Sequence, residues 1–488
     1  MRKTFITNFS ILVLLNLLVK GIWVFGIDLQ VQNAVGAEQY GIYYALLNIS
    51  FLLNMFLDIG ITNFNTFNIA QNRQLASKHF SLIFNLKLLL GIFYLICTII
   101  LAVIIGYNLY QLGLLLILCI NQFLNSFILY MRSNLSGLQL YKPYTLTSVL
   151  DRLIMISLIS SILWGGFIHE SFKIEWFIYA QTIAYSISAL ISFFLVWKNI
   201  RPFLPIFKLN FSLVILKKSL PYAVLILFMM IYNRSDGILI ERLLPDGKLQ
   251  AGIYAQSFRL MDAANMIAFL AAGLLFPMFS KMLKEKTRID QLLNFSFRWM
   301  VLPALIIAVA MCYNNNEIMD FLYQEHTQTS GPIISLLMGG FVAVTISYIF
   351  GTLLTANGNL KQLNIMAFAI ALLNIILNIV LIKSLNAKGA AISVFISQWS
   401  AAIIQFLIAQ NLFRFNINYR LIFSIILFVI GAFILGLLIK YLEFPWFISF
   451  IITICACLVL GFLLKLFDVK EIVHLLANVK EEQMQSKI

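Results

Sequence analysis

Ten ionisable side chains interrupt the apolar segments of this chain, each of which is about long enough to cross a bilayer. A charge at the centre of a bilayer costs at least ~2.5 kcal/mol, so such residues usually line a wet cavity or pair with one another. They are therefore the candidate functional residues. The ten are Lys20, Asp28, Asp58, Lys87, Asp151, Arg152, Arg234, Asp236, Arg259 and Asp262.

Depth in the membrane separates these charges. Lys20 lies about 16 Å along its helix, and Arg234 lies about 23 Å along a later one. Both are too deep to reach an interface easily, which favours a role inside a cavity. Arg259 lies about 12 Å along the helix that follows Arg234, at a similar depth. Asp262 is three residues beyond Arg259 and shares its face, whereas Asp236 points about 200° away from Arg234.

The other charges have a structural and a functional interpretation. Asp151 and Arg152 form either a structural ion pair or part of a site, and the same alternatives hold for Arg259 with its neighbour three residues on. Asp58 ends a helix and is interpreted as a gate or ion-pair residue. Lys87 lies about four residues into its helix, and we expect its side chain to extend to the interface.

No group of side chains in the sequence indicates catalysis or a metal site. The five cysteines lie in apolar runs without metal-ligand spacing, and the four histidines form no cluster. No predicted outer loop is long enough to present a set of catalytic residues. We therefore expect no enzyme activity and no metal centre.

The composition is that of a membrane protein. Hydrophobic residues make up 61% of the chain and charged residues 11%, whereas soluble domains are about 25% charged. Apolar runs of roughly 20 residues recur along the whole length. They predict an all-α polytopic protein with fourteen transmembrane helices near residues 9–31, 40–62, 81–106, 110–131, 144–165, 175–197, 219–243, 251–279, 293–313, 332–356, 361–383, 389–411, 420–440 and 445–466.

Positive charge alternates between the predicted loops. With both termini in the cytoplasm, 23 of the 34 Lys and Arg residues fall on the cytoplasmic side and six fall in outer loops. The positive-inside rule requires this distribution, and one miscounted helix would invert every later loop. We interpret the net charge of +14 as anchoring to membrane lipids of the inner leaflet, and not as nucleic-acid binding.

A short motif occurs twice in the chain. QYGIYYALL at 39–47 aligns with QAGIYAQSF at 250–258, an offset of 211 residues. Six predicted helices, an even number, separate the copies, so both halves have the same orientation, as in parallel-repeat transporters. We expect a six-helix lobe at 1–200, a second at 201–411, two further helices within 412–467 and a cytoplasmic tail at 468–488.

The region of the first copy resembles a known family. The segment VGAEQYGIYYALLNISFLLNMFLDIGITNFNTFNIA, residues 35–70, contains Gly36, the run Tyr40-Gly41-Ile42-Tyr43, and Asp58 followed by Ile59-Gly60. It is similar to the second-helix signature of the polysaccharide-export flippases, such as O-antigen exporters, within the multidrug/oligosaccharidyl-lipid/polysaccharide exporter superfamily. The segments GIYAQSFRLMD at 252–262 and NAKGAAISVFISQ at 386–398 also resemble this family.

The resemblance implies a flippase that moves a polyprenyl-pyrophosphate-linked oligosaccharide across the bacterial inner membrane by alternating access. The three deep cations would hold the pyrophosphate. The implied partners are this substrate and a polysaccharide polymerase, with Na⁺ or H⁺ as the coupling ion and no other cofactor. In this interpretation six deep charges line the cavity, namely Lys20, Arg234, Arg259, Asp28, Asp236 and Asp262.

Two other functional classes compete with this interpretation. A cation-coupled drug exporter of the same superfamily would need an acidic cavity, and the six deep charges comprise three cations and three anions. Their sign therefore leaves both transporters open. An integral polysaccharide polymerase or ligase would present catalytic residues on a long outer loop, which the predicted topology lacks.

Overall fold

A computed structural model describes residues 15–16, 18–62, 65–66, 69, 76–138, 140–166, 170–200, 209–416 and 418–467. All regular structure in these ranges is helical, and eleven helices are long and apolar enough to cross a membrane. The all-α membrane fold expected from the sequence is therefore confirmed. The predicted cytoplasmic tail, 468–488, lies outside the described residues.

The helices follow the predicted segments closely. The elements of the first half are η1 (Ile22–Asp28), α2 (Leu29–Leu52), α3 (Met55–Asp58), α5 (Ala76–Ile105), α6 (Leu109–Gly137), α7 (Tyr141–Trp164) and α8 (Ile174–Asn199). Those of the second half are α9 (Leu209–Leu243), α10 (Gly247–Lys284), α11 (Asp290–Ser296), η3 (Phe297–Val301), α12 (Leu302–Tyr313), α13 (Asn315–Leu322), α14 (Thr327–Ala356) and α15 (Leu360–Phe413). Two helices complete the described chain, α16 (Tyr419–Tyr441) and α17 (Trp446–Leu463).

Two of these helices each contain a break between two membrane crossings. In α2 the break is at Gly36, whose φ of 78° is accessible to glycine at little cost. In α15 it is at Asn386, with φ of 52°, and asparagine tolerates this region better than most residues. Divided at these two positions, the described helices give the fourteen predicted crossings. The short helix α13 was not predicted.

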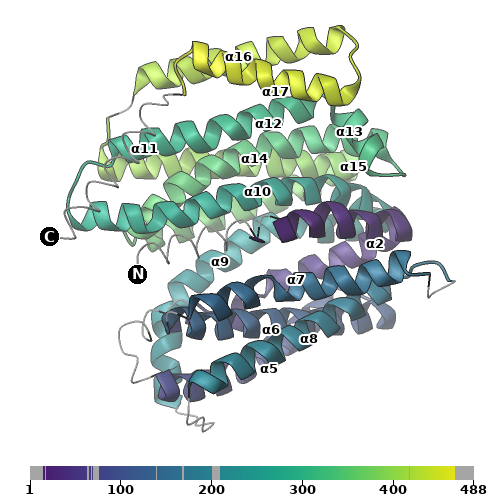
Figure 1. The fold of residues 1–488 in the computed structure, drawn as a ribbon, viewed down its shortest axis with the longest axis vertical. Coiled ribbons are helices and arrows are strands. Elements are labelled where there is room, and N and C mark those ends of the chain that lie inside the picture. Colours follow the sequence, from purple (N-terminus) through teal and green to yellow (C-terminus); the bar gives the residue numbers. More distant parts are fainter. Residues whose placement is uncertain are drawn as a thin grey trace. The chain divides into compact units, whose positions relative to one another are not determined.

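The chain forms two compact units. The first comprises Met1–Ala263, Leu322–Ser330 and Leu360–Ser397, and the second comprises Ala264–Phe321, Gly331–Asn359 and Gln398–Ile488. In the first unit, α5, α6, α7 and α8 lie side by side (Figure 1), and Phe80, Tyr130 and Leu135 are in their shared core. In the second, α12, α16 and α17 pack together. These units differ from the predicted lobes, whose boundaries stay a prediction.

Within the first unit, α2 and α10 come into close backbone contact at the glycines of the repeated motif. A Cβ atom on Gly41 would lie 1.8 Å from the carbonyl oxygen of Lys248. A Cβ atom on Gly252 would lie 1.8 Å from the carbonyl oxygen of Ala37. Ala37 and Lys248 are 211 residues apart, as the two glycines are. The contact is therefore the same seen from either copy, and only glycine permits it on both sides.

Candidate functional site

Arg259, the predicted cavity cation of α10, is paired with a buried carboxylate. Its Nε lies 3.2 Å from Asp28 Oδ2 and donates to the hydroxyl oxygen of Tyr40 at 3.0 Å. The Tyr40 hydroxyl in turn donates to Asp28 at 3.0 Å. The side chain of Asp28, the last residue of the π-helix η1, is only 4% exposed. The charge of Arg259 is therefore already compensated within the protein.

Arg234, the predicted cation of α9, is compensated in the same way. Its Nη1 lies 3.2 Å from Asp262 Oδ2, and its guanidinium group packs over the rings of Phe51 and Phe258. Asp262 is thus paired with a residue of another helix, and not with Arg259 on its own helix as the spacing allowed. Both second-half arginines take their carboxylates from neighbouring helices.

Lys87 does not extend to the interface, and this expectation was wrong. Its side chain is 1% exposed, and its Nζ lies 2.5 Å from Asp58 Oδ1. The same ammonium group donates to the carbonyl oxygen of Leu57 at 2.8 Å and to Ser126 Oγ at 3.0 Å. Asp58 also accepts from the hydroxyl of Thr62. A buried ammonium group needs a counter-charge, and α3 ends in the carboxylate that supplies it.

Lys20 gathers with two arginines of the first half. Arg152 and Arg132 lie close enough to repel it electrostatically, and Asp151 attracts it. Arg152 Nε is 3.6 Å from Asp151 Oδ2, whereas the ion pairs among the described residues include neither Lys20 nor Arg132. Two further cations and one carboxylate are therefore grouped around Lys20. We call this group the first-half cation cluster, comprising Lys20, Arg132, Arg152 and Asp151.

Aromatic rings hold the two guanidinium groups of this cluster. Arg152 lies over the ring of Trp23 at 5.0 Å, and Trp23 stacks on Phe177. Arg132 lies over the ring of Tyr144 at 4.9 Å and donates to its hydroxyl at 3.3 Å. A ring face stabilises a cation without occupying its N–H donors. Arg152 also donates from Nη1 to Met155 Sδ at 3.6 Å, whereas the buried Nε of Arg132 has no partner among the described residues and stays available to an anion.

Asp236 is surrounded by neutral groups. Asn378 Nδ2 donates to its Oδ1 at 2.7 Å, and the hydroxyl of Tyr254 donates to its Oδ2 at 3.3 Å. Asn378 Nδ2 also reaches Asn374 Oδ1 at 3.0 Å, which accepts from Ser235 Oγ at 3.1 Å. No cation of the described chain lies within ion-pair distance of Asp236. We call these five residues, which are all buried, the Asp236 cluster.

Two further carboxylates bind first-half segments to second-half segments inside the first unit. Glu325 accepts from the backbone N–H of Ala37 at 3.2 Å, directly after the break in α2. Glu241, near the end of α9, accepts from the Tyr107 hydroxyl and from Gln111 Nε2, both at 3.0 Å. The predicted topology puts both contacts at the outer membrane surface. They are contacts that an opening of this side would break.

The structure divides the nine predicted site residues into different environments. Six form the pairs Asp28–Arg259 and Arg234–Asp262 and the adjacent Asp151–Arg152 contact. Sequence reasoning missed Arg132, because α6 was predicted to end one residue before it. It also did not single out Asn374 and Asn378, although a spacing of four residues puts both on one face of a helix.

Comparison with known proteins agrees with the fold. A family model described as polysaccharide biosynthesis protein matches residues 5–283, which is more than half of the chain. The chain belongs to this family. Comparison of this polysaccharide biosynthesis protein with curated sequences gives no match.

Solved structures resemble it over most of its length. The lipid II flippase MurJ, in an inward closed conformation, aligns with a TM-score of 0.69 and 16% identity, covering 93% of this chain and 97% of that one. An inward-facing multidrug resistance MATE transporter aligns at 0.59 and 14%, covering 80% and 94%. A MOP-superfamily transporter from Pyrococcus furiosus, described by the reverse polarity of its binding pocket, aligns at 0.54 and 16%, covering 83% and 93%. At these identities the likeness is one of fold.

Proposed function

We propose that this protein moves a polyprenyl-pyrophosphate-linked oligosaccharide from the inner to the outer leaflet of the bacterial cytoplasmic membrane, for a cell-surface polysaccharide such as O-antigen. The observation that carries the proposal is the first-half cation cluster, where Lys20 lies near two arginines and where Lys20 and Arg132 form no ion pair with a described residue. A pyrophosphate that leaves water needs fixed cations that are not already paired. Family membership supports a role in polysaccharide synthesis.

The proposed pyrophosphate site differs from the one expected from the sequence. Lys20 stays in it and is joined by Arg132, which forms no ion pair with a described residue, whereas Arg234 and Arg259 are paired with carboxylates. Arg152 lies beside Lys20 and keeps its own contact with Asp151 at 3.6 Å. The field of Asp28 reaches both Arg152 and Arg259. An arriving pyrophosphate would bind Lys20 and Arg132 first, because neither has a carboxylate partner among the described residues. Arg259 could bind it only after its ion pair with Asp28 breaks.

In this proposal the head group crosses the membrane by alternating access, in which the binding site opens first to one side and then to the other. The head group would enter from the cytoplasmic side, where both termini are expected, and would bind the first-half cation cluster. Release outside would require the outer contacts of Glu325 and Glu241 to separate. A polymerase is the expected partner that then consumes the oligosaccharide. No chemical bond changes in the cargo, so the protein acts as a transporter and not as an enzyme.

We propose that the Asp236 cluster takes the coupling ion, H⁺ or Na⁺. A buried carboxylate without a cation is unstable unless it binds a proton or a metal ion. The amide oxygen of Asn378 is buried without a hydrogen-bond partner among the described residues, and carboxylate and amide oxygens are the ligands that hard cations prefer. Loading and unloading this cluster would bias α9 and α15, which supply Asp236 and the two asparagines.

The competing drug exporter would need accessible carboxylates for an organic cation. Asp28 and Asp262 are bound to arginines, and Asp236 is 1% exposed. This distribution of charge favours an anionic cargo over a cationic one.

The test is a flipping assay in proteoliposomes with a fluorescent polyprenyl-pyrophosphate oligosaccharide and a membrane-impermeant quencher. Wild-type protein should make the inner-leaflet probe accessible. The double variant Lys20→Ala/Arg132→Ala should slow this at least tenfold, because each charge-assisted hydrogen bond contributes about 1.5–3 kcal/mol. Neither residue has an ion-pair partner among the described residues, so folding should be retained.

The control removes the same charge elsewhere. Lys198 and Lys361 are exposed cations outside both clusters, and Lys198→Ala/Lys361→Ala should flip at the wild-type rate. Lys20→Arg should keep most of the activity. Wild-type flipping by Lys20→Ala/Arg132→Ala would remove the cluster from the mechanism. Extrusion of ethidium without flipping would favour the drug exporter.

A further inference from the structure

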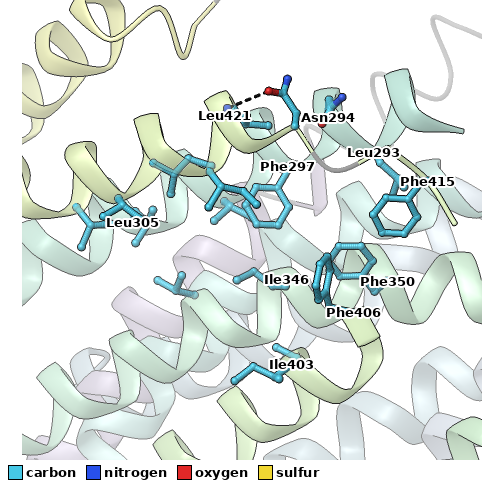
Figure 2. A pocket seen from close by; sticks show the side chains of 18 of the residues that line it. Leu293, Asn294, Phe297, Leu305, Ile346, Phe350, Ile403, Phe406, Phe415 and Leu421 are labelled. Carbon is cyan, nitrogen blue, oxygen red and sulfur yellow. Dashed lines mark hydrogen bonds between the residues drawn. The ribbon is translucent and has the colours of Figure 1, made fainter. Parts of the chain in front are cut away.

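The second unit contains an apolar groove that none of the proposed transport steps uses. It has a volume of about 360 Å³ and is formed by α11, η3, α12, α14, the end of α15 and α16. Figure 2 shows the rings of Phe297, Phe350, Phe406 and Phe415 at its wall. Phe350 packs edge to face on Phe406 and stacks on Phe415. This wall is preformed, since the rings already support one another.

One side of the groove is open along its length. Ile403 is 53% exposed, Ile422 is 42% and Ile426 is 50%, and all three line the groove. They belong to α15 and α16, helices with the hydropathy of membrane spans. What surrounds such a side chain in the membrane is acyl chain, so the groove opens to the lipid phase.

The groove is polar at one end only. Asn294, Asn416 and Asn418 line it there, together with Asp290. Two of these side chains are already used: Asn418 Oδ1 accepts from the backbone of Leu421 at 3.0 Å (Figure 2), and Asp290 Oδ1 accepts from the backbone of Asn416 at 2.8 Å. The positive-inside rule assigns this end to the cytoplasmic surface.

Basic residues flank this polar end. Arg414 and Arg420 are exposed and stand directly before and shortly after the lining residues Phe415, Asn416 and Asn418. The carboxylate of Asp290 faces a backbone N–H and forms no ion pair with a described residue. The mouth of the groove therefore combines hydrogen-bonding amides with excess positive charge.

We propose that this groove is a binding site for an anionic phospholipid of the inner leaflet, such as phosphatidylglycerol. One acyl chain lies along the aromatic wall, and the phosphate meets Arg414 and Arg420 at the polar end. The chemistry selects this occupant because apolar length and a cationic mouth match a chain and an anionic head group. A zwitterionic phospholipid matches the wall but gains less at the mouth.

The groove and the proposed cargo-binding residues belong to different units. The groove lies wholly within the second unit, whereas both charge clusters lie within the first. An occupied groove joins η3 to α15 and α16 through one ligand. Anionic lipid would thus stabilise the second unit whether or not cargo is present.

Trp399 lines the groove and provides the probe. The full-length protein is reconstituted with phosphatidylglycerol or phosphatidylcholine whose acyl chains are brominated, because bromine quenches tryptophan on contact. The chain has seven tryptophans, so the Trp399 signal is taken as the difference between wild type and Trp399→Phe. Brominated phosphatidylglycerol should quench this signal at a lower mole fraction than brominated phosphatidylcholine.

Two variants locate the preference. Arg414→Ala/Arg420→Ala should lose about fivefold in phosphatidylglycerol affinity for each arginine removed and should leave quenching by phosphatidylcholine unchanged. Ala402→Phe, which fills a buried position in the groove, should reduce quenching by both lipids. The matched control Lys198→Ala/Lys361→Ala removes two exposed cations elsewhere and should behave as wild type.

Three outcomes would overturn the proposal. Equal quenching by the two lipids would mean that the groove holds ordinary surrounding lipid. An unchanged preference in Arg414→Ala/Arg420→Ala would mean that the arginines do not select the head group. Displacement of the brominated lipid by equimolar unlabelled polyprenyl phosphate would assign the groove to the cargo tail. Each result is independent of the flipping assay, so it can fail while the transport proposal stands.

Discussion

The two halves of the repeat carry opposite uncompensated charge in their interiors. In the first half, Lys20 and Arg132 lie near each other and form no ion pair with a described residue. In the second half, Asp236 has only neutral hydrogen-bond partners. Both groups lie in the first unit, so the contrast belongs to one compact body.

The other four deep charges of the first unit form two ion pairs. Arg259 with Asp28 and Arg234 with Asp262 each form an ion pair across two helices. Pairing makes an intramembrane charge a structural element, whereas an unpaired charge needs a counter-charge from outside the protein. Paired charges are therefore assigned to helix packing, and unpaired charges to ligand binding. The first half would bind an anionic ligand and the second half a cationic one.

The largest effect should come from removing the counter-charge of the most buried cation. Asp58→Asn leaves the ammonium group of Lys87, 1% exposed, without a counter-charge and should lower the free energy of unfolding by about 3–5 kcal/mol. Lys87→Met should cost less, because Asp58 is 34% exposed and keeps some hydration. The double variant should regain most of the loss. Thermal unfolding in detergent measures all three, and an unchanged midpoint for Asp58→Asn would show that pairing is not structural here.

An intermediate effect should come from the contact between the two halves. In Gly252→Ala the new methyl group would meet the carbonyl oxygen of Ala37, and the forced separation of α2 and α10 should cost about 1–3 kcal/mol. Gly273 lies on the same helix with open space around it, so Gly273→Ala should stabilise by up to about 1 kcal/mol. If the two variants melt alike, the close backbone contact does not hold the halves together.

The smallest effect on stability should come from the unpaired carboxylate. Asp236→Asn keeps the shape of the side chain and one acceptor oxygen, and the Tyr254 hydroxyl can turn to accept from the new amide group. The free energy of unfolding should therefore change by no more than about 1 kcal/mol. Flipping should instead lose its response to an imposed pH or Na⁺ gradient. If Asp236→Asn lowered the free energy of unfolding as much as Asp58→Asn and kept the gradient response, Asp236 would have a structural role and not an ion-binding one.

The sequence predicts most of the fold because membrane crossing is a local property. Length, hydropathy and loop charge place each helix within a few residues, and the breaks at Gly36 and Asn386 fall between predicted segments. The pairing of charges is not local. No feature of the sequence near Lys87 indicates that Asp58, 29 residues away, is its partner. Whether Arg132 lies in a helix or in a loop depends on where α6 ends.

The matched glycines of α2 and α10 also bear on how such a chain arises. A contact that is identical from both sides is the kind that joins two copies of one subunit across a two-fold axis. In a homodimer, one mutation at that glycine would strike the interface twice. Once the copies are fused in a single gene, their neighbours can diverge independently: Tyr40 reaches a carboxylate, whereas its counterpart Ala251 has no side-chain hydroxyl to offer. Fusion of two such copies would let one half become cationic and the other acidic while the reciprocal glycine contact is kept.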